Sequence, residues 1–318
     1  MRKKALDKKL QRIIVSAVVW LIAAAIYGIS SLLGIDIQIS TVPESRPPVS
    51  SNASAALTSE SMVKVIDVGQ GCSVLVKTAG ENTKSILIDA GETHAGDAVC
   101  QAIKSAGISS LDLFIISHPH TDHYGGAIDV LKQFKVSELW LPDVDEDLTP
   151  TNSTYEKFLS AIEKNGCRVV LKSKAEKLKL GGNATLSIVD GFVDSPSDLN
   201  NTSLCIRLDI GEASFLMTGD AETELEKLMI NNNANIDADI LVAGHHGSNS
   251  SSSQKFLNVV TPTASVIPVG KDNDYGHPHK EPLERVKNYT NDIYRTDICG
   301  SIVVSSDGEK LDINYENQ

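Results

Sequence analysis

Residues 111–126, LDLFIISHPHTDHYGG, decide how the rest of the sequence is interpreted. The apolar run 113–116 is typical of a short buried strand. After Ser117 come four potential metal ligands within six residues, His118, His120, Asp122 and His123. Imidazole and carboxylate together are the ligand set of Zn²⁺ and its neighbours in the transition series. A loop at a strand end can aim all four at one centre, whereas a helix, whose face repeats every three to four residues, cannot. The stretch therefore predicts a metal site.

The sequence opens with a basic segment, residues 1–12, that carries six basic side chains and one acidic one. Residues 13–34 follow without a charge, and about 20 apolar residues are enough to span a hydrocarbon core as a helix. We therefore expect a transmembrane anchor at 13–35, with the N-terminus in the cytoplasm and the rest outside the cell, because basic flanks stay inside. A cleaved signal peptide is the alternative, but the apolar run exceeds the usual length of about 7–15 residues and no small-residue cleavage site follows. The expected location is the cell membrane, as a single-pass protein.

Residues 36–61 are rich in Ser, Pro and Ala and show no periodicity, which predicts a flexible linker. Beyond residue 12 the chain carries 23 basic and 40 acidic residues, a net charge of −17. This balance argues against tight binding of duplex nucleic acid, because phosphate contacts need Lys and Arg. Five cysteines are scattered without CxxC spacing, and their odd number argues against a disulfide framework. We expect no essential disulfide.

From residue 62 onward, short apolar runs and amphipathic stretches alternate, joined by short turns. The first half predicts strands at 62–68, 73–77, 85–89, 113–116, 138–141, 168–171 and 186–190 and helices at 97–105, 126–134 and 154–165, the last capped near Ser153. The second half predicts strands at 204–210, 214–218, 240–243, 264–269, 302–305 and 311–314 and helices at 222–230, 253–260 and 281–289. Two similar halves, each with strands first and helices after, predict two sheets packed face to face with helices outside. One compact α/β domain, 62–318, accounts for this pattern.

Three further loops at strand ends carry chemistry. They contribute Asp220 in FLMTGD, His245 and His246 in AGHHGS, and Tyr275, His277 and His279 in DNDYGHPH. Asp220 suits a helix N-cap, a metal ligand, or both at once. Of eight histidines, seven lie in strand-end loops, whereas His94 stands alone and is expected at the surface.

The HPHTDH stretch resembles the HxHxDH signature of the metallo-β-lactamase fold. More specifically, several blocks are similar in content and order to the soluble domain of ComEC-type DNA-uptake channel proteins: VIDVGQG, LIDAG, NNTSLCIRL, FLMTGD, ADILVAGHHGSNSSSS, YGHPH and IYRTD. The resemblance covers residues 63 to about 306 and implies an αββα sandwich that hydrolyses its substrate with bound metal. This sequence holds no counterpart of the polytopic channel portion, so transport through a channel is not implied.

The resemblance also implies roles for individual residues. Metal ligands fall on His118, His120, Asp122 and His123, a bridging carboxylate falls on Asp220, and a late ligand falls on His245 or His246. We favour His245, the first of the pair past the strand. The site-one His of many relatives has no counterpart, and Asn200 and Asn201 stand in that region, which bears on the occupancy of the His118/His120 metal. Cys72 stands where such relatives usually carry Asp, which bears on substrate choice.

The expected chemistry is hydrolysis by an activated water. Two neighbouring divalent ions, Zn²⁺ or Mn²⁺, would lower the pKa of a water toward about 7, and Asp122 or Asp220 would orient it. His277 or His279 would protonate the leaving group or hold an anionic substrate, although a structural Gly-His-Pro turn is the alternative. Residues 248–253, beginning with Ser248, would offer hydroxyls to a phosphate or form a polar loop.

We expect an exported, metal-dependent phosphodiesterase or nuclease whose substrate is DNA or RNA. Esters of choline phosphate on wall polymers, or lactones, are alternatives for the same metal core. A different class remains open as well, a non-catalytic binding module that uses metal for structure. The membrane is contacted through the N-terminal helix, and no protein partner is implied.

Overall fold

The computed structural model of the protein describes residues 60–80, 82–196 and 198–317. The predicted basic tail, anchor and nearly all of the linker fall within residues 1–59 and so lie outside the described residues. Within the described ranges, no helix combines the length and the apolar character needed to cross a membrane.

The described strands form two sheets. The first has the order β15–β14–β1–β2–β3–β4–β5–β6, with bounds Leu311–Tyr315, Ile302–Ser306, Ser61–Val65, Val74–Lys77, Ser85–Ile88, Ser110–Ile115, Lys135–Pro142 and Arg168–Lys172. The second has the order β13–β12–β11–β10–β9–β8–β7, with bounds Ile293–Arg295, Ala264–Ile267, Ile240–Val242, Ala213–Met217, Ile206–Ile210, Ala184–Ile188 and Glu176–Gly181. The last two strands return to the first sheet, where β14 pairs with β1.

Each sheet contains a parallel part that positions the polar loops. Strands β3 to β6 run parallel, as do β10 to β13. Parallel neighbours end on the same edge of a sheet, so the loops after β3 and β4 meet at one edge of the first sheet. The loops after β10, β11 and β12 likewise meet at one edge of the second. In open α/β sheets, ligands bind outside these carboxyl ends.

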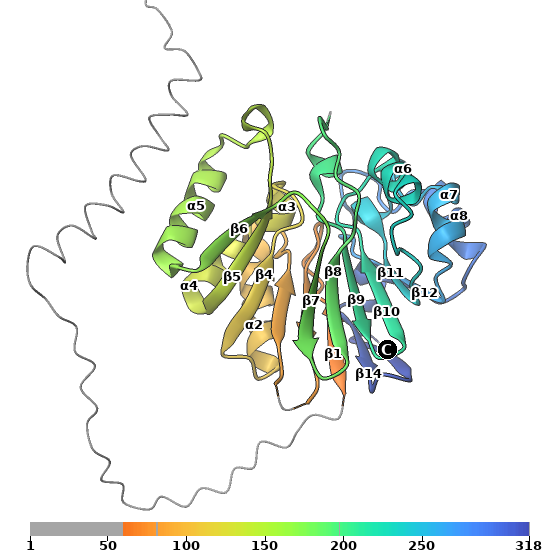
Figure 1. Ribbon diagram of the computed structural model, residues 1–318, viewed down its shortest axis with the longest axis horizontal. Coiled ribbons are helices and arrows are strands. Elements are labelled where there is room, and N and C mark those ends of the chain that lie inside the picture. Colours follow the sequence, from red (N-terminus) through yellow and green to blue (C-terminus); the bar gives the residue numbers. More distant parts are fainter. Residues whose placement is uncertain (1–59, 81, 197, 318) are drawn as a thin grey trace, which may run out of the picture. The chain divides into compact units, whose positions relative to one another are not determined.

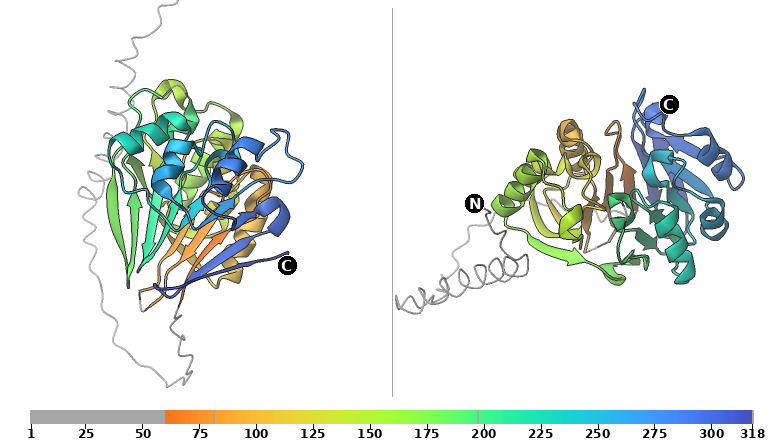
Figure 2. Two further views of the ribbon diagram at one scale, coloured as in Figure 1. Left: turned by 90° about the vertical axis from the view of Figure 1, so that its right-hand side faces the viewer. Right: turned by 90° about the horizontal axis from the view of Figure 1, so that it is seen from above.

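The helices cover the outer faces of the two sheets. Their bounds are α2 Gly96–Ser105, α3 Thr121–Tyr124, α4 Ala127–Gln133, α5 Ser153–Asn165, α6 Thr223–Asn231, α7 Gln254–Val260, α8 Lys280–Lys287 and α9 Thr296–Cys299. Figure 1 shows α2, α4 and α5 on one side of the sheets and α6, α7 and α8 on the other. The view from above in Figure 2 shows the same layering.

The burial of alternate residues explains these layers, because successive side chains of a strand point to opposite faces. In β4, Leu113 and Ile115 lie in the core between the sheets, whereas Phe114 packs outward against the helices of the first sheet. In β10, Phe215 faces the same central core and Leu216 packs outward with α6 and α7. The predicted αββα arrangement, two sheets face to face with helices outside, is confirmed.

Two strands were not expected from the sequence. β7 (EKLKLG) carries exposed charged side chains on alternate positions, and β13 is only three residues long. Both are edge strands of the second sheet. At α5, Asn152 rather than Ser153 is the N-cap, accepting a hydrogen bond from the Tyr155 amide at 2.9 Å.

Candidate metal centre

The loop after β4 brings its ligands together by turning sharply onto the short helix α3. His118 and His123 are fully buried. The turn is held by Asp89, which follows β3 and accepts from both the Ser117 amide and the Ser117 hydroxyl at 2.7 Å. At Gly126 a Cβ would lie only 2.1 Å from a backbone carbonyl oxygen of the loop after β3. A larger residue there would push the two loops apart.

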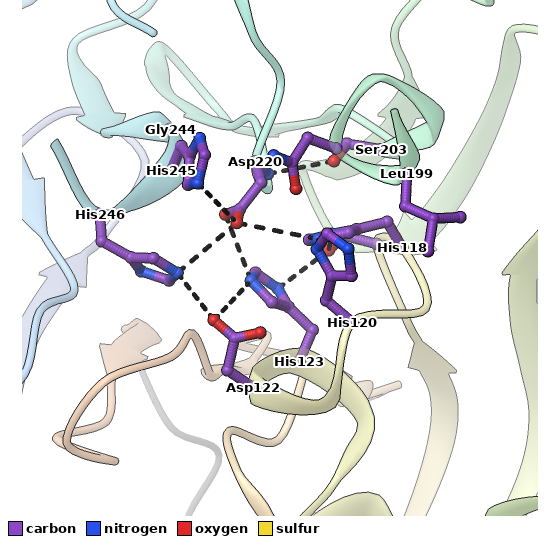
Figure 3. A network of polar contacts seen from close by, with 12 residues as sticks. His118, His120, Asp122, His123, Leu199, Ser203, Asp220, Gly244, His245 and His246 are labelled. Atoms are coloured by element: carbon purple, nitrogen blue, oxygen red, sulfur yellow. Dashed lines mark hydrogen bonds and ion pairs between the residues drawn. The ribbon is translucent and has the colours of Figure 1, made fainter. Parts of the chain in front are cut away.

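Asp220 arrives from the second sheet, just past β10, and is 2% exposed. Its amide donates to the Ser203 hydroxyl at 3.0 Å. Helix α6 begins later, after Glu222, so the N-cap role that the sequence allowed for Asp220 is not realised. The carboxylate instead faces the histidines, as Figure 3 shows.

Asp220 lies within ion-pair distance of imidazoles from both sheets. Its Oδ1 is 3.2 Å from His123 Nε2. Its Oδ2 is 3.8 Å from His118 Nε2 and 3.6 Å from His246 Nε2. His118 Nε2 in turn lies 3.0 Å from His120 Nδ1. A carboxylate that lies among four imidazoles can bind two metal ions, one through each of its oxygens.

Two groups of ligand atoms among the described residues could each hold a metal ion, and they share Asp220. One group comprises Asp122, His123, Asp220 and His246, and the other comprises His118, His120 and Asp220. In each group the candidate atoms lie within 4.8 Å of one another. Two of these atoms, His123 Nε2 and Asp220 Oδ1, are buried and face each other at 3.2 Å without a hydrogen bond to any other described group. Imidazole nitrogens and carboxylate oxygens gathered in this way are a donor set that fits divalent cations.

Of the two consecutive histidines after β11, His246 joins a ligand group and His245 does not. His246 is 2% exposed, its Nδ1 lies 2.9 Å from the Pro268 carbonyl oxygen, and its Nε2 lies 3.2 Å from Asp122 Oδ2. His245 Nδ1 instead contacts Ser250 Oγ at 3.1 Å and Glu222 Oε1 at 3.3 Å. The ligand group thus favours His246 over the predicted His245, although His245 Nε2 also lies 3.8 Å from Asp220 Oδ2. Both residues have a positive φ, 49° and 54°.

Outer hydrogen bonds decide which ring nitrogen is free to bind metal. His123 Nδ1 lies 2.8 Å from Asp89 Oδ2, and a carboxylate only accepts, so Nδ1 carries the proton and Nε2 is left for an ion. The Pro268 carbonyl does the same for His246. The Ser117 hydroxyl already donates to Asp89, so it accepts from His118 Nδ1 at 3.1 Å. These partners orient the three rings so that their Nε2 atoms face the centre.

The charges of the centre depend on one another. Burial disfavours ionised carboxylates, but the neighbouring imidazoles of His123 and His246 outweigh it and lower the pKa of both Asp122 and Asp220. Burial, and after it the charge of His123, lowers the pKa of His118 well below its usual value. For His123, burial is outweighed by Asp220 and the other carboxylates around it, which raise its pKa. The centre therefore keeps its carboxylates ionised.

The loop after β12 supplies the remaining predicted residues. The His277 ring lies 5.6 Å from the ring of His245 and 4.8 Å from that of His279. Burial and the neighbouring His246 lower the pKa of His277 to about 4, so its imidazole is neutral at neutral pH. His279 Nδ1 accepts from the Asn249 amide at 3.0 Å. Tyr275 is 66% exposed.

The serine-rich loop has a supporting place. Ser248 Oγ contacts Ser250 Oγ at 3.1 Å, and Ser250 contacts His245. Ser251 Oγ donates to the Gly244 carbonyl at 2.7 Å. These hydroxyls support the loop that carries His245 and His246. Ser248 itself is buried, with 8% of its surface exposed.

Asn200 and Asn201 contact the start of α6 and belong to neither candidate ligand group. Asn200 Nδ2 donates to Glu222 and Asn201 Nδ2 to Glu224, both at 3.3 Å. Asp220 is thus the third candidate ligand beside His118 and His120 in the described residues. Cys72 packs in the core between the sheets, where burial and the nearby carboxylates, Asp89 first, raise the pKa of its thiol.

Asp89 and Glu222 were not identified from the sequence as site residues. Asp89 carried a signal, because it follows a buried strand in LIDAG in the same way that Asp220 follows one in FLMTGD. Nothing in the sequence indicated Glu222 as a site residue, since an acidic residue ahead of a helix is ordinary.

Comparison with known proteins gives the same picture. Residues 66–271 match the Metallo-beta-lactamase superfamily. The chain is 32% identical to ComE operon protein 3 of Bacillus subtilis (strain 168), over 77% of this chain and 33% of that protein. It is 31% identical to Competence protein ComA of Neisseria gonorrhoeae, over 80% of this chain and 33% of that one. The chain thus spans about a third of the length of these relatives.

Among solved structures, CmlA, a diiron beta-hydroxylase from Streptomyces venezuelae, aligns with a TM-score of 0.48 at 12% identity, over 74% of this chain and 52% of that one. The family is shown by the sequence match, which covers both halves of the candidate centre from Asp89 to His246. The chain belongs to the metallo-β-lactamase superfamily and, within it, matches competence proteins of the ComEC type.

Proposed function

We propose that this chain is an exported, membrane-anchored, metal-dependent phosphodiesterase that cleaves nucleic acid. The observation that carries the proposal is the pair of donor groups joined by Asp220. Within them His123 Nε2 and Asp220 Oδ1 are buried and face each other at 3.2 Å without a hydrogen bond to any other described group.

The residues divide the work in the following way. His118, His120 and Asp220 would hold one ion, and Asp122, His123, Asp220 and His246 the other. Zn²⁺ or Mn²⁺ bound there would supply Lewis acidity and make a nucleophile available at neutral pH. Asp122, which is partly exposed, would accept a hydrogen bond from the attacking water and orient it. His277 is neutral at neutral pH, which favours holding the substrate over protonating a leaving group.

Nucleic acid is the preferred substrate because the chain resembles the soluble domain of ComEC-type DNA-uptake channel proteins and its relatives include ComE operon protein 3 and Competence protein ComA. The net charge of −17 beyond residue 12 means that phosphates would be held by the ions and by few cationic side chains. Salt should therefore weaken binding less steeply than in a nuclease with a basic groove, whose affinity falls with the number of phosphates it neutralises.

The location follows from residues outside the described ranges. The uncharged run 13–34 behind a basic tail would anchor the chain in the cell membrane, with residues 62–318 on the outer side.

The test is hydrolysis by the purified chain of DNA, RNA and small phosphodiesters, with Mn²⁺, with Zn²⁺ and with EDTA. We expect cleavage with metal and none with EDTA. His120→Ala should lower turnover by at least about 100-fold at unchanged melting temperature, because a ligand is lost while the fold remains. His94→Ala, which removes an exposed histidine, is the matched control. If all phosphodiesters stay intact while metal is bound, the substrate is a different ester or a lactone.

A further inference from the structure

An exposed aromatic ring stands at the rim of the metal centre. Tyr275 is 66% exposed, and its ring stacks on the ring of His277 with centroids 5.5 Å apart and planes inclined by 22°. Burying a large apolar side chain is favourable. One face of the Tyr275 ring is covered by His277, but most of the side chain remains in contact with solvent.

The stacked pair leads directly into the centre. The His277 ring lies 5.6 Å from that of His245 and 6.3 Å from that of His246. His246 is the late member of the second ligand group. A flat ligand lying on the free face of Tyr275 would therefore be separated from a candidate metal ligand by two stacked or neighbouring rings.

The loop that carries Tyr275 is held firmly by its own hydrogen bonds. The Asn273 side chain donates to the Gly270 and His277 carbonyls at 2.9 and 2.7 Å. Its Oδ1 accepts from the Tyr275 and His277 amides at 3.2 and 3.0 Å. The His279 amide then ties the end of the loop to Gly247. A ring that is already fixed loses little entropy when a ligand stacks on it.

The surroundings of the ring favour stacking over charge. Lys271 and Lys280 are offset in this segment by Asp272 and Asp274, so the loop offers no net attraction to phosphate. Beside Tyr275, a Cβ built on Gly276 would meet nothing within 4 Å, which leaves open space next to the ring. His277 Nδ1 is buried without a hydrogen-bond partner among the described residues, so the backing ring offers the exposed surface no competing polar group.

We propose that Tyr275, backed by His277, is a stacking platform for an unpaired nucleobase, and that the centre therefore takes single-stranded nucleic acid. The proposal rests on the proposed function and names its substrate class. Every base has a π-face that an aromatic side chain can stack on, so such a platform is indifferent to sequence. In a duplex those faces are occupied by neighbouring base pairs, and exposing one costs unstacking and unpairing.

The experiment compares wild-type, Tyr275→Ala and Tyr275→Phe chains, with Ile298→Ala as a control that shortens another side chain of similar exposure, 61%. The substrates are single-stranded DNA and RNA of one sequence, the DNA duplex, and a single strand of equal length with abasic sites throughout. Cleavage gives kcat/KM for each substrate. Quenching of 2-aminopurine placed in the single strand, recorded by rapid mixing before cleavage, reports stacking independently of turnover.

We expect the wild-type chain to prefer the single strand to the duplex. Tyr275→Ala should lower kcat/KM on the single strand by about 5- to 150-fold, the range for loss of one stacked base. It should leave the abasic strand unchanged, whereas Tyr275→Phe and Ile298→Ala should resemble wild type. Whether the DNA or the RNA strand is preferred shows which source of the base the platform serves.

The other outcomes separate the two proposals. Equal cleavage by wild-type and Tyr275→Ala chains would overturn the platform and leave the nuclease intact. Quenching that is lost in Tyr275→Ala, without cleavage by any chain, would keep the platform and overturn the nuclease. Neither binding nor cleavage of any strand would overturn both.

Discussion

Asp220 belongs to both ligand groups, whereas Asp122 belongs to one. Asp220→Ala should therefore remove metal from both positions, and Asp122→Ala from the position that includes His246. Elemental analysis of the purified variants measures the metal, and a melting curve shows that the fold survives. If the bound ions were purely structural, their loss would unfold the domain, because binding energy is then folding energy. Unchanged metal content in both variants would end the two-metal assignment.

Asp89 acts on the centre through His123, whose Nδ1 lies 2.8 Å from its carboxylate. Asp89→Asn should lower metal affinity by about 10- to 100-fold, the usual cost of losing an outer partner of a metal-binding histidine. Titration of the metal-free chain with Zn²⁺ or Mn²⁺ measures this affinity. Asp97→Asn, an exposed carboxylate in the first turn of α2, is the control and should bind like wild type. Equal affinities in the two variants would remove Asp89 from the centre.

At the scale of residues, the sequence predicted the candidate metal ligands that lie in short local motifs. HPHTDH and the Asp after FLMTG are local patterns, and the structure brings all of their candidate ligands together. The choice between His245 and His246 was different, because adjacent histidines give the same local pattern and both Nε2 atoms lie within 4 Å of Asp220 Oδ2. Asp89 was missed because its partner, His123, is 34 positions away.

The N-cap residue of helix α5 also contacts α3, the short helix in the loop after β4. Asn152 Oδ1 accepts from the Tyr155 amide at 2.9 Å and from the Tyr124 hydroxyl of α3 at 3.3 Å. Asn152→Ala should lower the free energy of unfolding by about 1–2 kcal/mol, because an N-cap is lost together with the partner of a buried hydroxyl. Urea unfolding measures the change. Asn152→Asp keeps a capping oxygen and should lose much less, and an equal loss in both variants would contradict the capping explanation.

Glu226 of α6 is a buried carboxyl, 2% exposed. It accepts from the Ser253 amide at 3.0 Å, and Arg285 of α8 lies near enough to act on its charge. Burial outweighs these partners and raises the pKa of Glu226. The folded domain therefore favours the protonated form, a stabilisation that is complete below the unfolded value of about 4.3 and is lost as pH rises through the folded pKa.

Glu226→Gln keeps the shape and the acceptor oxygen but has no proton to lose. The stability of the wild-type chain relative to this variant should decline as pH rises above about 4.3. Urea unfolding of both chains at several pH values between 4 and 8 measures the difference. A difference that stays constant over this range would show that Glu226 has the same pKa folded and unfolded.

At the scale of elements, periodicity predicted the strands and helices that have one buried face. β7 was not predicted because its charged residues are interspersed with only two leucines. β13 was not predicted because three residues are too few to show an alternating pattern. Helix α3 escaped because its four residues, TDHY, are too few to show a helical face. Short elements are fixed by their neighbours rather than by their own sequence.

At the scale of the whole molecule, the protein is expected to span the cell membrane. Its N-terminus would lie in the cytoplasm, residues 13–35 in the membrane and the hydrolase domain outside. Protease added to intact cells should therefore remove the domain, while a cytoplasmic protein of the same cells stays intact as the control. The linker at 36–61, rich in Ser and Pro, offers the cleavage sites. Protection of the domain until the cells are lysed would show that the orientation is reversed.

The order of strands has a consequence for when the candidate metal centre can form. β1 at the start of the described domain lies between β2 and β14, so the first sheet closes only when the last strands arrive. The centre is likewise divided, with His118 to His123 after β4 and Asp220 and His246 after strands of the second sheet. Pairings between distant parts of a chain form late. Until the second half of the domain has folded, His118 to His123 therefore stand without Asp220 and His246, which complete the two candidate ligand groups.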